Sequence, residues 1–157
     1  MHLPEAADKR TGMAGQAYGI GNFRCAEDEA VLVEFAPPPC HHWSFSLANY
    51  YWESIDYATR QTSLNGHQAH LDRDGVFRGV ISHTDPGVAN WLDPGGNTEG
   101  SIALRFLFAE HAPQPVLRTV KRSQVESALP DARRVEPAER AAVLTARRRA
   151  VMRRYRA

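Results

Sequence analysis

The sequence contains few cysteines and no long apolar run. Cys25 and Cys40 match no metal-binding or redox spacing, and nothing else indicates an oxidising compartment. We therefore predict two buried free thiols rather than a disulfide. Apolar stretches reach at most six residues, too short for a transmembrane helix, so no membrane span is expected. The first thirty residues lack a basic start followed by an apolar run, which predicts no signal peptide and a cytoplasmic protein.

Signatures of well-known catalytic classes are also missing. Ser63, Ser82 and Ser101 lie near histidines in sequence, but no Gly-x-Ser-x-Gly elbow surrounds any of them. The glycine-rich pieces "YGIGN" and "DPGGN" precede no helix, as a phosphate-binding loop would require. The cupin pattern of His-x-His followed by glutamate is absent. No cofactor and no metal ion is predicted, and whether the chain is an enzyme stays open.

What the sequence does have is the length and composition of one globular domain. The chain has 157 residues, of which 43% are hydrophobic and 24% charged, enough for a core without disulfide or metal. Its net charge of +1 hides an asymmetry. Residues 1–120 hold 8 basic and 14 acidic residues, a balance of −6, whereas residues 121–157 hold 11 basic and 4 acidic residues, a balance of +7. The body is acidic and the tail basic, and the overall charge identifies no partner.

Period-two alternation of apolar residues predicts β-strands along the acidic body. Val31, Val33 and Phe35 share one face, and so do Trp43, Phe45 and Leu47. Ile102, Leu104, Phe106 and Phe108 alternate in the last strong strand. Strands are predicted within residues 16–25, 29–36, 42–47, 67–71, 76–82, 100–110 and 112–123, with the turn "DRDG" joining 67–71 and 76–82 into a hairpin.

The basic tail has the pattern of a helix. Pro137 and the early glutamates are typical of a helix start, and arginines crowd the end of a segment spanning 136–157. A short helix is expected at 123–128. The face expected to pack comprises Ala141, Leu144, Arg148, Val151 and Tyr155. We predict a mainly β protein, an antiparallel β-sandwich or jelly roll with a C-terminal α-helix, divided into a loose lead-in (1–14), the sandwich (15–121) and a basic helical extension (122–157).

Candidate site residues are most closely spaced in residues 82–96, "SHTDPGVANWLDPGG". His83 and Asp85, with the distant His111, match the pattern of a two-histidine, one-carboxylate iron site, for which Arg118 would supply a cosubstrate contact. Against this, Asp85 precedes a Pro-Gly pair, and an aspartate there caps its own turn. His67 and His70 would point to opposite faces of a strand and share a metal only in a loop or bulge. We favour the interpretation that the segment is a corner pinned to the core.

Two classes of function follow. The leading hypothesis is a non-catalytic module that binds a ligand or a partner, with Asn65, Arg78, Asn90 and Trp91 as candidate binding residues. The alternative is a small enzyme, with or without a metal ion, with His83, Asp85 and His67 as catalytic candidates.

The arginine-rich tail has its own alternatives. Nine arginines lie between residues 133 and 157, and a basic helix can bind nucleic acid or an anionic membrane. The arginines are spread around several helix faces, which weakens the membrane interpretation. We favour packing on the acidic body of the same chain or of a neighbour, hence a homo-oligomer or a partner protein, over nucleic acid.

Several segments together resemble a known family. These are the Trp-Ser-Phe strand at 43–45, "SLNGHQA", "DGVFRGVI" and above all "DPGVANWLD". Over about residues 15–120 the chain resembles the bacterial domain of unknown function 1214, often paired with an upstream domain of unknown function 1254. The resemblance implies a jelly-roll-like sandwich and no established reaction. Family members usually have "NWLDT-x-G", where this chain has Pro94 in place of the threonine. They are also commonly longer, so we expect a stand-alone version, or a remnant that needs a partner.

Overall fold

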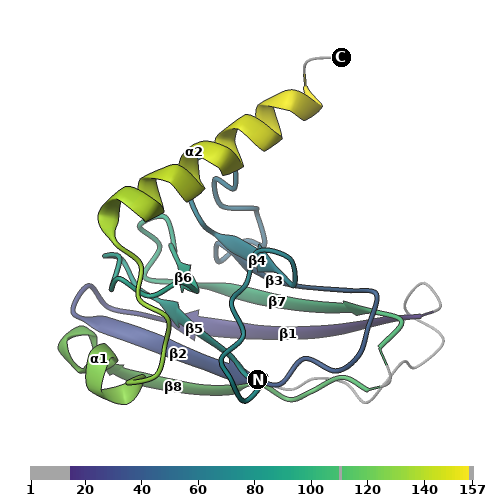
Figure 1. Cartoon of the computed structure of the whole chain (residues 1–157), viewed down its shortest axis with the longest axis horizontal. Coiled ribbons are helices and arrows are strands. Elements are labelled where there is room, and N and C mark those ends of the chain that lie inside the picture. Colours follow the sequence, from purple (N-terminus) through teal and green to yellow (C-terminus); the bar gives the residue numbers. More distant parts are fainter. Residues whose placement is uncertain (1–14, 110, 156–157) are drawn as a thin grey trace.

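Two four-stranded β-sheets pack face to face, and a long helix projects from one side (Figure 1). The computed structural model describes residues 15–109 and 111–155. The first sheet has the order β1-β7-β3-β4 and the second β6-β5-β2-β8. The strands are β1 (Gln16–Arg24), β2 (Glu29–Phe35), β3 (His42–Ala48), β4 (Ser63–Asn65), β5 (Phe77–Ile81), β6 (Trp91–Leu92), β7 (Glu99–Leu107) and β8 (Val116–Lys121). A 3₁₀ turn η1 (Arg122–Gln124), the short α1 (Val125–Ala128) and the long α2 (Pro137–Arg154) follow. The predicted mainly β sandwich with a C-terminal helix is confirmed.

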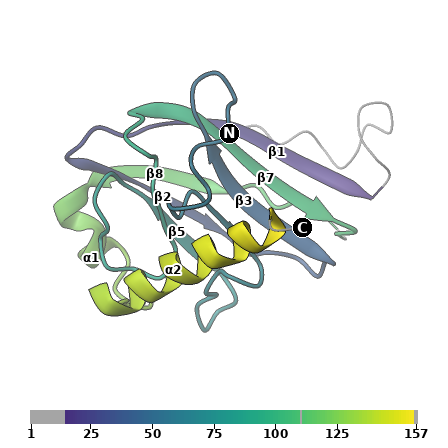
Figure 2. The same ribbon diagram turned by 90° about the horizontal axis from the view of Figure 1, so that it is seen from above.

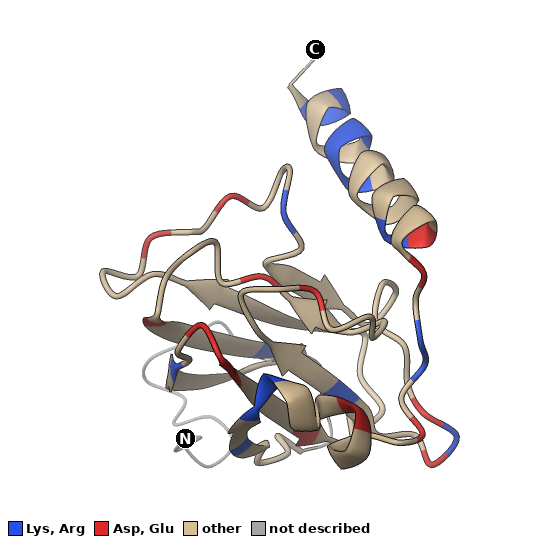
Figure 3. Ribbon diagram, turned by 90° about the vertical axis from the view of Figure 1, so that its left-hand side faces the viewer, with Lys and Arg blue, Asp and Glu red and all other residues tan. Residues whose placement is uncertain are grey.

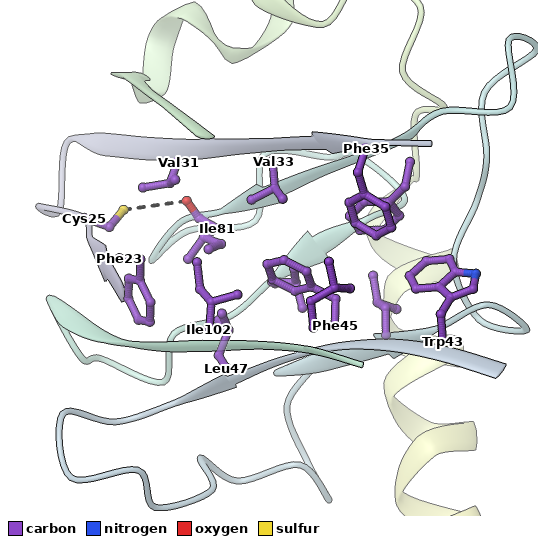
Figure 4. Close-up of a cluster of buried hydrophobic side chains, with 14 of the residues drawn as sticks. Phe23, Cys25, Val31, Val33, Phe35, Trp43, Phe45, Leu47, Ile81 and Ile102 are labelled. Carbon is purple, nitrogen blue, oxygen red and sulfur yellow. Dashed lines mark hydrogen bonds between the residues drawn. The ribbon is translucent and has the colours of Figure 1, made fainter. Parts of the chain in front are cut away.

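The main core fills the space between the two sheets. The alternating residues predicted to face inward do so: Val33 and Phe45 are fully buried, and Phe35 nearly so. Figure 4 shows the aromatic part of this core, where the Phe35 ring lies 4.9 Å from that of Phe77 and 5.3 Å from that of Trp43, centroid to centroid. Burial of these large rings stabilises the packing of the two sheets.

A second, smaller core lies on the outer face of the second sheet. Leu32 and Val80 point outward from β2 and β5, and segment 125–132 covers them with Val125 and Leu129. Trp91 closes the edge of this cluster. Because both faces of β2 are covered, its sequence is a continuous apolar run rather than a strict alternation.

Part of the predicted hairpin is wrong. Residues 66–68 form a turn and residue 69 a bend, and within 67–71 only Leu71 makes a bridge, to Phe77. The strand of this region is β4, which begins four residues earlier and pairs antiparallel with β3. The "DRDG" turn itself is confirmed: the Gly75 amide donates to Asp72 at 2.8 Å, and Gly75 has a φ of +76°. The sequence also gave no sign of β6, which pairs parallel with β5.

Helix α2 begins at Pro137 as predicted, but its packed face differs. Leu144 and Val151 are half-buried, whereas Ala141, Arg148 and Tyr155 are exposed. The buried residue of the helix is Arg140. In Figure 1, α2 projects at the top of the molecule, above the two sheets, and in the view from above it passes in front of them (Figure 2). No helix within the described residues is long and apolar enough to cross a membrane. The predicted lead-in, 1–14, lies outside the described residues, and the division of the rest at 121/122 stays a prediction.

Candidate functional site

The corner at residues 82–96 is built from two aspartate-capped turns. Asp85 Oδ1 accepts the Gly87 amide at 2.9 Å, and Asp93 Oδ1 accepts the Gly95 amide at 2.7 Å. Both glycines have positive φ, +73° and +62°, which a side chain would disfavour. The Asp-Pro-Gly sequence therefore forms the turn that its composition predicts.

Asn90, between the two turns, fastens the corner to the sheet. Its Oδ1 accepts the His70 amide at 2.8 Å, and its Nδ2 donates to the carbonyls of His70 at 2.7 Å and Arg78 at 3.0 Å. The side chain is buried, so these bonds use the amide group for structure. Trp91 is 8% exposed, and its indole N–H donates to the Ser82 carbonyl at 2.8 Å. The predicted pinning of the corner is what the geometry shows.

The corner also forms a socket for one arginine of α2. Arg140, 6% exposed, donates from Nε to Asp85 Oδ2 at 2.8 Å and from Nη groups to the Val88 and Ala89 carbonyls. Its guanidinium lies 5.4 Å from the centre of the Trp91 ring. A cation bonded to a carboxylate, to two carbonyls and to an indole face is well compensated for burial. The corner thus anchors the first turn of α2.

The three catalytic candidates do not meet at one hollow: His83 and Asp85 border different hollows, and His67 borders neither of these two. His83 places Nε2 2.9 Å from the Cys25 carbonyl and borders a hollow with Glu27, Asp28, Thr84 and Arg122. Asp85 borders a neighbouring hollow and pairs with Arg140. His67 is exposed, in the turn capped by Asn65, whose Oδ1 accepts the His67 amide at 3.0 Å, and lines neither hollow.

The described residues also form no cluster of metal ligands and present no activated cysteine. Among residues 15–109 and 111–155, no group of three or more histidine, cysteine, aspartate or glutamate side chains is placed to hold a metal. Both cysteines are free, with Cys25 buried and Cys40 half-buried. Burial, followed by the charge of Glu29, raises the pKa of Cys25 to about 11, so its thiol is protonated and unreactive at neutral pH.

Arg78, a binding candidate, borders a hollow lined by several carboxylates. It bonds three carboxylates: Asp74 at 2.7 Å, Asp72 at 2.9 Å and Glu34 at 3.2 Å. The hydrogen bond from Arg78 holds the pKa of Asp74 down at about 2. The hollow, of about 700 Å³, lies between the 71–74 turn and residues 128–132; we call it the acidic hollow. Its lining comprises Glu34, His70, Leu71, Asp72, Arg73, Asp74, Arg78, Ala128, Leu129, Pro130, Asp131 and Ala132.

Beyond its anchor, α2 contacts the body through few side chains. Arg147 donates to the Ser63 carbonyl at 2.6 Å, and the hydroxyls of Tyr57 and Tyr155 lie 3.1 Å apart. Desolvation lowers the pKa of Arg147, which has no carboxylate partner among the described residues. Figure 3 shows basic residues along the helix.

One outer face of α2 forms a basic stripe. Its members are Thr145, Arg148, Arg149, Met152 and Arg153, which border a hollow of about 620 Å³. These residues recur every three or four positions and so lie on one side of the helix. Within the described part of the chain, no carboxylate lies within 4.0 Å of the stripe's arginines. Sequence reasoning identified the basic helix but not this face, nor Arg140 as its anchor.

Comparison with known proteins finds likeness only among solved structures, since no family model and no curated protein matches the chain. An uncharacterized protein from Burkholderia cenocepacia is 32% identical over 78% of this chain, with a TM-score of 0.72. A protein from Vibrio parahaemolyticus is 16% identical over 68% of this chain, with a TM-score of 0.58, and shows the fold alone. This chain covers 36% and 31% of those two proteins, about a third of their length.

Proposed function

We propose that this chain is a non-catalytic binding module of a bacterial cytoplasmic protein, in which the β-sandwich holds α2 as the contact surface for an acidic protein partner. The observation that carries the proposal is the basic stripe. It is presented by a helix whose first turn is fixed at Arg140, and its arginines have no carboxylate partner within the described chain.

Charge and composition support a protein partner. Six arginines and one glutamate lie within α2, a balance of +5, and among the described residues only Arg140 of these arginines pairs with a carboxylate of the body. Arginine and methionine are enriched at protein–protein interfaces, where planar guanidinium groups bind carboxylates in pairs of hydrogen bonds. The stripe has too few apolar residues for a helix that inserts into a membrane surface.

Membership of the domain of unknown function 1214 family is part of the same proposal. The motifs of the corner support it, and so does a fold shared with two longer bacterial proteins. A domain that is about a third of such proteins has, in them, further polypeptide available as a neighbour. A module that binds protein is consistent with that setting.

The test uses a defined acidic probe. We expect a fluorescent poly-glutamate peptide to bind the wild-type chain in an anisotropy titration, and to bind R148E/R149E more than about tenfold more weakly. The matched control is R118E/R122E, which makes the same change in net charge at two exposed arginines of β8 and η1. If both variants weakened peptide binding equally, net charge alone would explain the loss, and the proposal would be contradicted.

The second candidate is a small enzyme around His83, Asp85 and His67. Its support is the placement of His83 beside an open hollow that Glu27 and Asp28 also line. The pairing of Asp85 with Arg140 and the separate position of His67 weigh against it. An activity found in the wild type and abolished in His83→Ala, with the fold retained, would favour this candidate over the binding module.

A further inference from the structure

Resting on the proposed function, we infer that the acidic partner is a second copy of this chain, whose acidic hollow receives the basic stripe of α2. The result is a head-to-tail assembly. Three observations lead to it: the unpaired stripe, the composition of the hollow, and the positions of the two on the molecule.

The first observation is that the charge split of the chain is not neutralised within one copy. The body carries −6 and the tail +7, yet α2 contacts the body through Arg140 and Arg147 and leaves the residues of the basic stripe exposed. Arg148, Arg149 and Arg153 have no carboxylate within 4.0 Å in the described ranges. Their complement is available on every other copy of the same chain, at the same concentration.

The second observation is that the acidic hollow matches the stripe in chemistry. Its lining contains four carboxylates and two arginines, a balance of −2 with His70 neutral. Asp131 is exposed and makes no ion pair with any described residue, so its carboxylate is available to a guanidinium. Leu71 and Pro130 supply apolar surface for Met152, the one apolar member of the stripe. In the proposed contact, the arginines around Met152 of the stripe face the carboxylates around Leu71 and Pro130 of the acidic hollow.

The third observation concerns position. The hollow lies beside the end of α1, at the base of the sandwich in Figure 1, whereas α2 projects at the top. A stripe and a hollow on opposite ends cannot meet within one chain. They give a heterologous contact between copies, which forms a ring or an open chain of subunits rather than a symmetric pair.

Sedimentation velocity of the full chain over a wide concentration range tests this inference. We expect wild type to associate beyond the dimer and to dissociate as salt is raised, because the contact is charged and exposed. The stripe variant R148E/R149E and a hollow variant, L71R/D131R, should each weaken association more than about tenfold. R118E/R122E should associate like wild type. Circular dichroism checks that every variant is folded.

Mixing the two defective variants gives the sharpest outcome. One variant keeps an intact hollow and the other an intact stripe, so an equimolar mixture should form one-to-one complexes and stop there. Failure of the mixture to form that complex, or self-association that both variants leave unchanged, would overturn the inference.

The inference and the proposed function can fail separately. A wild type that is monomeric at every concentration, yet binds poly-glutamate through Arg148 and Arg149, overturns the second copy as partner and keeps the binding function. A wild type that neither self-associates nor binds poly-glutamate overturns the inference and the proposed function together. Binding of a DNA duplex through the same arginines, without self-association, would assign the stripe to nucleic acid and overturn the inference.

Discussion

Arg140 joins the two parts of the molecule that the chain keeps fifty residues apart. Its guanidinium bonds Asp85 and two carbonyls of the corner and lies against the Trp91 ring. Asp85 therefore has two tasks, since one oxygen caps the turn and the other holds the helix. The chemistry that made Asp85 a catalytic candidate, a carboxylate at the end of a strand, is used here to seat a cation.

We expect Arg140→Ala to lower the free energy of unfolding by about 2–3 kcal/mol, because it leaves Asp85 and the Val88 and Ala89 carbonyls without their partner in a largely buried place. Urea denaturation measures the change. Arg148→Ala is the matched control on the same helix, and its exposed side chain should change stability by no more than about 0.5 kcal/mol. Equal effects of the two substitutions would contradict the anchoring role.

At the residue scale, the sequence predicted the corner residues that receive Arg140 but not Arg140 itself. Asp85, Asn90 and Trp91 were identified because Asp-Pro-Gly and Asn-Trp have recognisable local conformations. Arg140 is one of several arginines in a basic helix, and no local pattern distinguishes it from Arg148. Only the path of residues 130–136 determines which arginine reaches the corner.

The elements differ in how firmly they are held. β7 lies between β1 and β3, with its apolar side chains in the main core. Helix α2, about 27 Å long from its residue count, buries little besides Arg140. Most helical stability in proteins comes from packing of an apolar face, and α2 has only Leu144 and Val151 for this purpose.

Amide hydrogen exchange should therefore rank the elements. We expect the amides of α2 beyond residue 147 to exchange well before those of β7, because the end of the helix opens without opening the sandwich. Mass spectrometry of peptides covering 145–155 and 101–107 measures the difference. Equal protection of both segments in monomeric protein would show that α2 is packed as firmly as the sheets.

Strands with strict alternation were predicted well, and the hairpin at 67–71 was not. "GHQAHL" has polar and apolar residues at alternating positions, but Asn65 caps a turn there through the His67 and Gln68 amides. A side chain that bonds the local backbone competes with strand pairing, and it wins here because β3 already pairs with the earlier β4. The face of α2 was misjudged for a similar reason: arginine stems can cover surface that an apolar pattern assigns to aliphatic residues.

At the scale of the whole molecule, the described residues form two apolar clusters separated by one sheet. β2 and β5 contribute to both, since Val33 and Phe77 face the main core while Leu32 and Val80 face segment 125–132. Shared strands make the two clusters mechanically dependent on one another. We infer that residues 122–135 belong to the same folding unit as the sandwich.

Two truncations test this dependence. Phe77→Ala in the main core should cost about 3–5 kcal/mol and Leu129→Ala in the second cluster about 2–4 kcal/mol, because both side chains are fully or nearly fully buried. Each variant should still unfold in one transition seen identically by tryptophan fluorescence and circular dichroism. A separate early transition in Leu129→Ala would indicate that segment 122–135 folds independently.

By itself the sequence determined the class of the fold, the inward faces of the long strands, the turns at Asp-Pro-Gly and Asp-Gly, the start of α2 and the separation of charge along the chain. These are local properties, fixed by side-chain periodicity, backbone preference and composition. Only the tertiary structure decided that the corner holds Arg140, that Arg78 lies among three carboxylates, and that the basic stripe of α2 has no carboxylate partner among the described residues. Each of these depends on which distant segments meet. Packing of the whole chain sets those contacts, and local sequence patterns do not determine them.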